Sequence, residues 1–172
     1  KPWDTKTAIT YEKEATGIYI TAHPLEEYSY ALKYMSTTDS LKLADEDYCF
    51  EHDQQTVSVI GIVAAIQNKI TKKGNPMAFI TVEDLYGNIE IVVFNEVYRQ
   101  NASLLQKEKV LYICGKVSAK ENQSASIIAQ SIKEFDNADL KLLIKLSQKD
   151  YEKYAGDIKE ILSKSPGEAK VY

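Results

Sequence analysis

A lysine-rich turn leads directly into a segment that alternates in polarity and carries one aromatic side chain, a combination that could hold a nucleic acid. The turn reads Lys72-Lys73-Gly74-Asn75-Pro76, and residues 77–83 follow it. Strand alternation puts Phe79 and its neighbours Met77 and Thr81 on the side opposite Ala78, Ile80 and Val82. Because the second set is small and aliphatic, we expect it to face a core, which leaves Phe79 on the open side. An aromatic ring can stack on a base, and lysines can neutralise phosphates.

Other polar and basic residues near this turn, and near a second predicted turn, extend the candidate site. Lys69 precedes the first turn, Asn75 could meet a phosphate oxygen or a base edge, and Lys116 and Lys120 flank the second turn. Arg99 falls on a short predicted helix between the two turns. The predicted nucleic-acid-binding residues are Phe79, Lys72, Lys73, Asn75, Lys69, Thr81, Lys116, Lys120 and Arg99.

Each candidate also has a plainer structural interpretation. Aromatic side chains on strands commonly pack in a core, so Phe79 could be buried instead of exposed. A lysine-rich turn is commonly only solvated surface, and Thr81 and Glu90 could be ordinary polar residues of a strand face. The alternation favours an exposed Phe79 without excluding a buried one.

Residue types that usually carry catalysis do not form a recognisable site in the sequence. His23 stands beside a proline and is expected to be structural. Glu83 and Asp84 are adjacent in a strand, so they point to opposite sides, and Asp84 is expected to open the turn that ends at Gly87. Two Cys and two His at scattered positions make no zinc pattern. We therefore predict no catalytic residue, no metal site and no cofactor.

Charge is distributed unevenly along the 172 residues, whose net charge is −4. Residues 1–56 carry 5 Lys against 11 acidic residues, residues 57–135 carry 9 Lys and Arg against 7, and residues 136–172 carry 7 of each sign. The middle segment is therefore the only basic one. An anionic partner is expected to bind there.

The bulk composition is typical of a globular protein. The hydrophobic fraction is 44%, and no apolar run approaches the roughly 20 residues needed to cross a bilayer. The first ten residues lack the apolar segment of a secretory signal, so we expect a cytoplasmic protein in which Cys49 and Cys114 are reduced thiols. A start without Met and an abrupt end suggest a piece of a longer chain.

The first 56 residues are predicted to be a helical region. Residues 9–19 are expected to form one helix with Tyr11, Ala15, Ile18 and Tyr19 along one face. Pro24 interrupts it, and residues 25–35 are expected to form a second helix. Residues 37–55 read as an acidic connector with room for a short helix.

Residues 57–138 are predicted to fold as a five-stranded barrel. Strands are expected at 57–70, 77–83, 89–94, 110–117 and 124–132, with a polar turn at 119–123 and a helix at 95–105 that Asn95 caps. Val97, Tyr98, Leu104 and Leu105 are expected to face the core. Gly61 inside the long first strand predicts a bend. Three strands, a helix and two strands is the order of an OB-fold β-barrel.

The last segment, residues 139–172, is predicted to begin a further α/β domain. A strand is expected at 140–146 and a helix at 149–162, followed by Ser165-Pro166-Gly167. The fold class is therefore mainly β with helical flanks. An OB barrel is preceded by a helical segment and followed by the start of another domain.

Several short stretches resemble the alpha (polymerizing) subunit of bacterial DNA polymerase III. Glu12-Lys13-Glu14, Gly17, Tyr19 and His23-Pro24-Leu25 resemble the stretch before that family's OB domain. Residues 72–79, 82–84, 87 and 91–94 resemble its OB core, and residues 115–117 resemble its fourth strand. Pro166-Gly167 resembles the opening of its tau-binding C-terminal domain. The resemblance runs over nearly the whole chain in the right order.

The resemblance implies a non-catalytic single-stranded DNA-binding module beside the template path. In that family the catalytic aspartates and the clamp-binding peptide lie upstream, and tau and the sliding clamp are partners of the parent chain. Two alternatives stay open. The barrel and its acidic flank could be a protein-interaction platform with little DNA contact, or the barrel could bind a tRNA anticodon, since it also resembles the OB domains of class II aminoacyl-tRNA synthetases.

Overall fold

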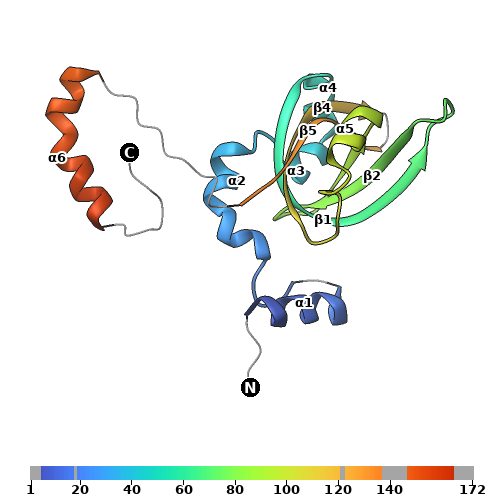
Figure 1. Cartoon of the computed structure of the whole chain (residues 1–172), viewed down its shortest axis with the longest axis horizontal. Helices are drawn as coiled ribbons and strands as arrows, with labels where there is room; N and C mark the ends of the chain where they lie inside the picture. Colours follow the sequence, from blue (N-terminus) through green and yellow to red (C-terminus); the bar gives the residue numbers. More distant parts are fainter. Residues whose placement is uncertain (1–4, 18, 121–122, 137–146, 165–172) are drawn as a thin grey trace. The chain divides into compact units, whose positions relative to one another are not determined.

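The computed structural model describes residues 5–17, 19–120, 123–136 and 147–164. They belong to two compact units, residues 1–135 and residues 136–172. The first unit holds a β-barrel and most of the helices, and the second holds one helix (Figure 1).

Five strands close into a barrel, which confirms the predicted OB fold. The strands are β1 (Thr56–Ile70), β2 (Pro76–Glu83), β3 (Asn88–Val93), β4 (Val110–Lys120) and β5 (Gln123–Glu134). Their order around the barrel is β1-β2-β3-β5-β4, with β3 and β5 parallel and every other pair antiparallel. The strand register therefore fixes which side chains share the outer face.

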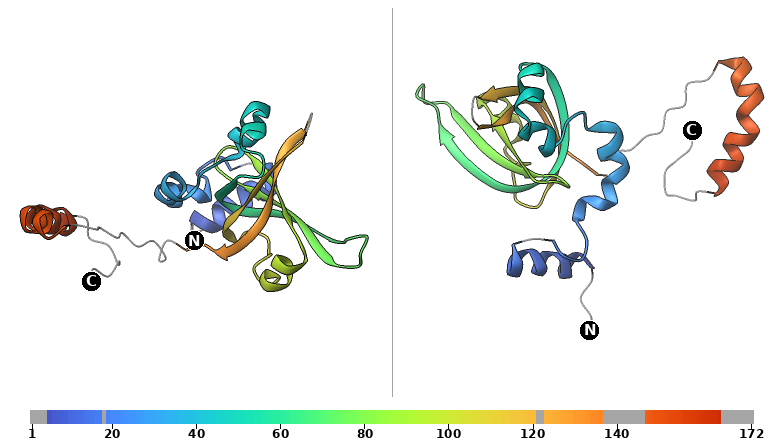
Figure 2. Two further views of the ribbon diagram at one scale, coloured as in Figure 1. Left: turned by 90° about the horizontal axis from the view of Figure 1, so that it is seen from above. Right: turned by 180° about the vertical axis from the view of Figure 1, so that it is seen from behind.

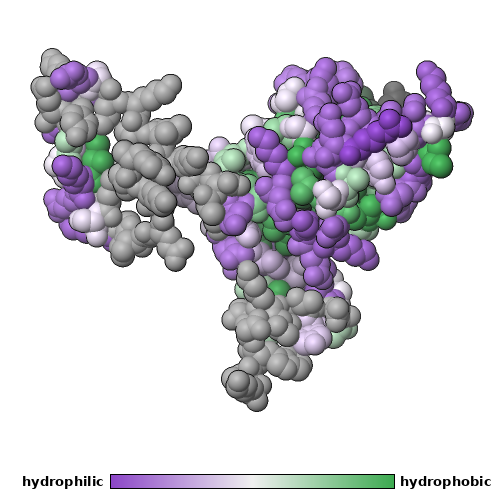
Figure 3. All heavy atoms as spheres, in the orientation of Figure 1, coloured by the Kyte–Doolittle hydropathy of each residue, from purple (hydrophilic) through white to green (hydrophobic). Residues whose placement is uncertain are grey.

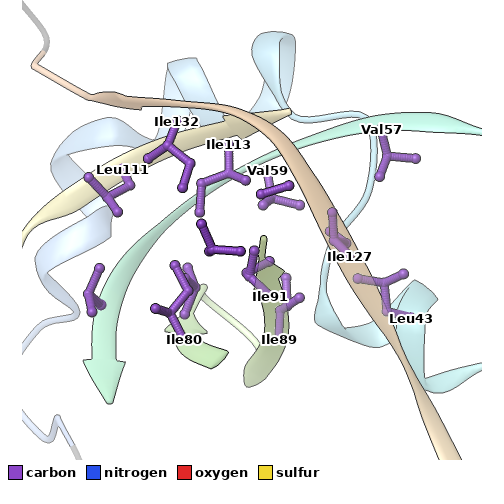
Figure 4. Close-up of a cluster of buried hydrophobic side chains, with 14 of the residues drawn as sticks. Leu43, Val57, Val59, Ile80, Ile89, Ile91, Leu111, Ile113, Ile127 and Ile132 are labelled. Atoms are coloured by element: carbon purple, nitrogen blue, oxygen red, sulfur yellow. The ribbon is translucent and has the colours of Figure 1, made fainter. Parts of the chain in front are cut away.

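Aliphatic side chains from all five strands fill the barrel. Ala78, Ile80 and Val82 of β2 are fully buried, as the alternation predicts. Figure 4 shows inward-pointing residues of the other strands meeting in the same interior, together with Leu43 from a flanking helix. Full burial of each such side chain stabilises the fold by about 1.5–3 kcal/mol.

Gly61 lies where β1 passes from one neighbouring strand to the other. Gly61 pairs with Leu111 of β4, while the next residue, Ile62, pairs with both Val110 of β4 and Glu83 of β2. A Cβ at position 61 would lie 2.7 Å from the Glu83 carbonyl oxygen and 2.3 Å from Val82 Cγ1. Only glycine allows so close an approach, and the register irregularity of β1 follows shortly after it, between Val63 and Ala65.

The N-terminal flank begins with α1 (Thr5–Thr16), which starts and ends earlier than predicted. Gly17 terminates it, because its φ of 79° is left-handed while its N–H still bonds to the Lys13 carbonyl. Tyr19 therefore lies outside the helix. Tyr11 is exposed and Ile9 is buried, so the predicted helix face was also wrong.

The second predicted helix is a 3-10 turn, η1 (Pro24–Tyr28), followed by α2 (Ser29–Met35). His23 caps the turn by accepting the Leu25 N–H on Nδ1. The acidic connector holds two short helices, α3 (Ser40–Ala44) and α4 (Glu46–Glu51). Asp39 and Asp45 are their N-caps, which explains why a polar segment is helical.

One helix, α5 (Asn95–Asn101), joins β3 to β4. It is shorter than predicted, and its N-cap is Phe94, so Asn95 is not the cap that the sequence suggested. Leu105 belongs to the core, and Val97, Tyr98 and Leu104 pack against it, as predicted. At the other hairpin, β4 continues to Lys120 and β5 begins at Gln123, so the turn between them is narrower than predicted.

The second unit contains α6 (Gln148–Lys164), close to the predicted helix. The strand predicted at 140–146 lies outside the described residues, and the assignment of residues 139–172 to a further domain stays a prediction. Among the helices that the structure describes, none is long and apolar enough to span a membrane.

Candidate nucleic-acid interface

Phe79 lies on the outer side of β2, and its ring is partly exposed. The core contains its neighbours Ala78 and Ile80 but not Phe79 itself. Its cross-strand partners are Gln67 on β1 and Val92 on β3. Phe79 is thus the central aromatic residue of an outer surface made from three adjacent strands.

Lys69 lies directly against this ring. It pairs with Met77, so it is the diagonal neighbour of Phe79 on the same face of the hairpin. Its Nζ is 4.6 Å from the centroid of the Phe79 ring, which is within cation–π distance. The structure therefore brings together two residues that the sequence analysis proposed separately.

Lys72 and Lys73 lie at the exposed tip of the β1–β2 hairpin. The tip is closed by hydrogen bonds from Thr71 N to Asn75 O and from Gly74 N to Thr71 O, both 2.8 Å long. Gly74 adopts a left-handed φ of 80°. The hairpin projects beyond the body of the barrel in Figures 1 and 2. Both ammonium groups are therefore accessible to a partner from several directions.

Charge changes sign along the outer face of β2 and β3. Thr81, partly exposed, pairs with the exposed Glu90 of β3, and Glu83 follows at the end of β2. The lysines lie at the hairpin end, so phosphates would meet attraction there and repulsion near Glu90. The lysines that β1, β2 and their turn contribute, Lys69, Lys72 and Lys73, all lie in the hairpin half.

The remaining predicted residues do not border Phe79 in the strand register. Lys116 of β4 pairs with Ile128 of β5 and with Thr56 of β1, which is at the opposite end of β1 from the hairpin. Lys120 ends β4, but its side chain lies outside the described residues. Arg99 is exposed on α5, a helix that contacts β2 and β5. The strand register does not place these three beside the ring.

Sequence reasoning missed Gln67 and Val92, which border Phe79 directly. Gln67 is exposed, whereas Val92 is only 7% exposed. Strand pairing would have identified both, since the turn at 71–75 sets the register of Gln67 and the turn at 84–87 sets the register of Val92. On the barrel face of Figure 3, hydrophilic side chains predominate and leave small hydrophobic patches, one of them on the projecting hairpin.

A second cluster of charged and aromatic residues joins the N-terminal flank to the end of β2. Lys13 Nζ donates to both carboxylate oxygens of Glu83 and lies 4.1 Å from the Tyr19 ring centroid. His23 Nε2 is 3.9 Å from Glu83 Oε1. Burial lowers the pKa of His23, although Glu83 opposes the shift, and burial also raises the pKa of Tyr19. This cluster is a structural contact between the flank and the barrel.

Asp84 makes a further contact between flank and barrel. Its side chain is buried and accepts hydrogen bonds from Ser40 N and Ser40 Oγ, each 2.7 Å long. It also accepts from the N–H groups of Tyr86 and Gly87 in the β2–β3 turn. The turn role predicted for Asp84 is confirmed. Among the described residues, no three His, Cys, Asp or Glu side chains are grouped to hold a metal ion.

Residues 57–135 match the family model of the OB-fold nucleic acid binding domain. DNA polymerase III subunit alpha of Mycobacterium tuberculosis is 27% identical over 175 residues, covering 99% of this chain and 14% of the relative. The same subunit of Buchnera aphidicola is 32% identical over 115 residues, covering 65% of this chain and 9% of the relative. The chain thus spans 14% of the length of the first relative and 9% of the length of the second.

Among solved structures, a mitochondrial single-stranded DNA binding protein of S. cerevisiae matches with a TM-score of 0.42 and 15% identity, covering 49% of this chain and 99% of that one. The sequence relatives show that the chain is a homologue of one segment of the DNA polymerase III alpha subunits, and the family model and the closed five-stranded barrel show that its barrel is an OB fold.

Proposed function

We propose that this chain is a non-catalytic module that binds single-stranded DNA within a replicative DNA polymerase. The binding surface is the outer face of the β1–β2 hairpin and β3, with Phe79 as the stacking residue. Lys69, Lys72 and Lys73 would contact backbone phosphates, and Asn75 and Thr81 would supply polar contacts. Template DNA is the expected ligand.

The observation that carries the proposal is the position of Phe79. It is an outward-facing, partly exposed ring on the central strand of an OB barrel, outside the core cluster and in contact with a lysine. Single-strand binders of this fold combine an aromatic stacking surface with a basic groove. In the first half of β1, by contrast, the outward side chains of Ser58, Ile60 and Ile62 are buried, so the hairpin half is the accessible half of the strand.

The charge distribution on the surface favours one placement of the DNA backbone. The exposed Glu90 disfavours phosphates at one end of the surface, where Glu83 is paired with Lys13, and the hairpin lysines favour them at the other end. Three residues of strand separate Phe79 from Pro76, roughly 10 Å, so Lys72 and Lys73 would meet the phosphate of a neighbouring nucleotide. Lys116, Lys120 and Arg99 contribute to long-range attraction more than to direct contact.

The parent chain is proposed to be a DNA-directed DNA polymerase, because its relatives carry that subunit's name. Other domains of that polymerase, tau and the sliding clamp would be partners through the parent chain. A cytoplasmic location follows from the same proposal.

A second function is favoured by a separate observation on α2. Tyr30 and Tyr34 are exposed by 64% and 62%, with ring centroids 4.5 Å apart, in a flank of net charge −6. Exposed aromatic residues are enriched at protein interfaces. The flank could therefore contact another protein while the hairpin contacts DNA.

Chemical-shift mapping of an oligothymidine titration tests the proposal. The expected result is weak, salt-sensitive binding, with the largest shifts at residues 67–81 and small shifts in α2. A folded transfer RNA serves as the competing ligand, because the anticodon alternative requires it to bind more tightly than oligothymidine. Absence of shifts in the hairpin at millimolar oligothymidine would contradict the proposal, and shifts confined to α3 and α4 would relocate the site.

A further inference from the structure

The ring of Phe79 is already covered by a cation of the same hairpin. Lys69 Nζ lies 4.6 Å from the ring centroid, and the register places the two residues diagonally across β1 and β2. Val92 and Met77, the neighbours on β3 and on β2 itself, are 7% and 8% exposed. The surface that remains for a stacked base is therefore shared with the Lys69 ammonium.

A base and the Lys69 ammonium cannot cover the same part of the ring together. A base that stacks there must displace the ammonium, which loses a cation–π interaction of the kind that changes an equilibrium about two- to five-fold at exposed sites. Displacement becomes favourable when the ammonium gains a phosphate, since charge-assisted contacts are stronger than neutral ones. A strand with a charged backbone supplies both the base and the phosphate.

We propose, building on the proposed function, that Lys69 is a specificity-determining residue that couples stacking on Phe79 to a charged backbone. Lys69 moves from the ring to the phosphate of the stacked nucleotide. The ligand class is therefore a phosphate-bearing single strand. Free nucleosides and neutral-backbone strands bind poorly, because they displace the ammonium without offering it a new partner.

Lys72 and Lys73 provide the contrast that makes this testable. They carry the same charge on the same hairpin, but they lie at the exposed tip beyond Ile70. Among the described residues, Lys69 is the lysine of this hairpin that lies over an aromatic ring. We expect them to attract phosphate without covering the Phe79 ring. Lys69→Met keeps the aliphatic stem and removes the charge, and Lys72→Met is the matched control.

The experiment compares oligothymidine with the same oligomer carrying neutral methylphosphonate linkages, on the full chain and both variants. Lys69→Met should bind the neutral oligomer about two- to five-fold more tightly than the wild type, and the charged oligomer more weakly. Lys72→Met should weaken binding of the charged oligomer and leave binding of the neutral oligomer unchanged. Each variant should lower the log-salt slope for the charged oligomer by about 0.7.

A second measurement locates Lys69 directly. In the unbound protein its ε-methylene protons should be shifted upfield by the Phe79 ring, and the shift should disappear in Phe79→Leu and on addition of oligothymidine. If the oligomer perturbs Phe79 while the Lys69 protons stay shifted, or if the two Met variants treat the neutral oligomer alike, the coupling is refuted and DNA binding stands. If oligothymidine perturbs neither residue, DNA binding at this site is refuted, and the coupling with it.

Discussion

The two halves of β1 belong to one strand but have opposite surroundings. In the first half, Ser58, Ile60 and Ile62 point outward and are nearly buried, and α2 is the helix that contacts this strand. In the second half, Gln67 and Lys69 point outward and are exposed. The change takes place at Gly61, where β1 leaves β4 for β2.

The flank covers the backbone edge of the first half as well as its side chains. Thr37 N donates to Ser58 O, and Ser58 N donates to Thr37 Oγ1, at 2.9 and 2.8 Å. Ile60 N donates to Ser36 Oγ. These bonds satisfy strand groups that would otherwise be an open edge. Residues 36–38 are therefore part of the barrel's structure, and removing the flank would do more than remove its negative charge.

The difference suggests that one half of the strand contributes mainly to stability and the other mainly to binding. The covered half gains stability from hydrogen bonds and burial, whereas the hairpin half keeps its polar groups accessible. Loss of a contact in the covered half should therefore lower the free energy of unfolding. Loss of a side chain in the hairpin half should change binding and leave stability nearly unchanged.

Asp84→Ala should cause the largest loss of stability among the contacts between flank and barrel. The carboxylate accepts four hydrogen bonds, two from Ser40 and two from the β2–β3 turn, and its loss leaves buried donors without a partner. We expect the free energy of unfolding to fall by about 3 kcal/mol in urea titrations. Asp84→Asn retains one carbonyl acceptor and should lose less. An alanine variant as stable as the wild type would show that the flank contributes little to stability.

Gly61→Ala should come next, with a loss of about 1–3 kcal/mol. The added methyl group would overlap Val82 and the Glu83 carbonyl, so β1 or β2 must shift. The control is Gly156→Ala in α6, where a Cβ meets nothing within 4 Å and helix propensity favours alanine. Equal unfolding midpoints for the two variants would contradict the close approach at Gly61.

The barrel was more predictable from the sequence than its flank. Strand alternation and the turn residues identified all five strands and the inward set Ala78, Ile80 and Val82. The flank depends on contacts between distant residues, such as Ser40 with Asp84, 44 positions apart, and local patterns do not encode these. The end of α1 was missed because the apolar and aromatic residues keep a helical spacing up to Tyr19. The helix nevertheless ends at Thr16, since Gly17 adopts a left-handed φ.

The candidate site was only partly predictable for a related reason. Each residue type could be singled out locally, but which ones meet depends on the strand register. Lys69 reaches Phe79 because the hairpin pairs Gln67 with Phe79. Lys116 carries the same charge, but it pairs with Ile128 of β5 and does not border Phe79. The role of these residues in binding stays a prediction.

In the hairpin half, Phe79→Ala and the double change of Lys72 and Lys73 to Met should weaken oligothymidine binding in different ways. Loss of stacking should cost about 1–3 kcal/mol at every salt concentration. Loss of two phosphate contacts should lower the log-salt slope by about 1.4. Fluorescence anisotropy across a salt series separates the two. A Phe79→Ala protein that is folded and binds normally would exclude stacking on this ring.

Neutralising exposed acids of the flank should have a smaller effect on the same binding. Glu46→Gln, Asp47→Asn and Glu51→Gln remove three exposed charges from α4 without touching its Asp45 cap. A unit charge roughly 20 Å away in water contributes about 0.2 kcal/mol, so the three together should tighten binding about two- to three-fold at low salt. The gain should vanish near 1 M salt, where the screening length is about 3 Å. A gain that persists there would mean that the flank touches the DNA.

Acidification should produce the smallest effect, a decrease in the free energy of unfolding that comes from the contact between flank and barrel. Burial lowers the pKa of His23, whose Nδ1 also accepts the Leu25 N–H, so the folded state resists protonation more than the unfolded state does. Both states are neutral at pH 8. As the pH falls through the unfolded value of about 6.5, the unfolded chain gains a proton that the folded chain resists, and the free energy of unfolding decreases.

His23→Asn isolates this contribution, because asparagine retains a capping oxygen and does not titrate. The variant should lose part of the decrease in the free energy of unfolding between pH 8 and pH 5.5. Oligothymidine binding at residues 67–81 should not change with His23, since no histidine lies in the hairpin. If His23→Asn and the wild type lose equal stability on acidification, the imidazole is not the group that responds.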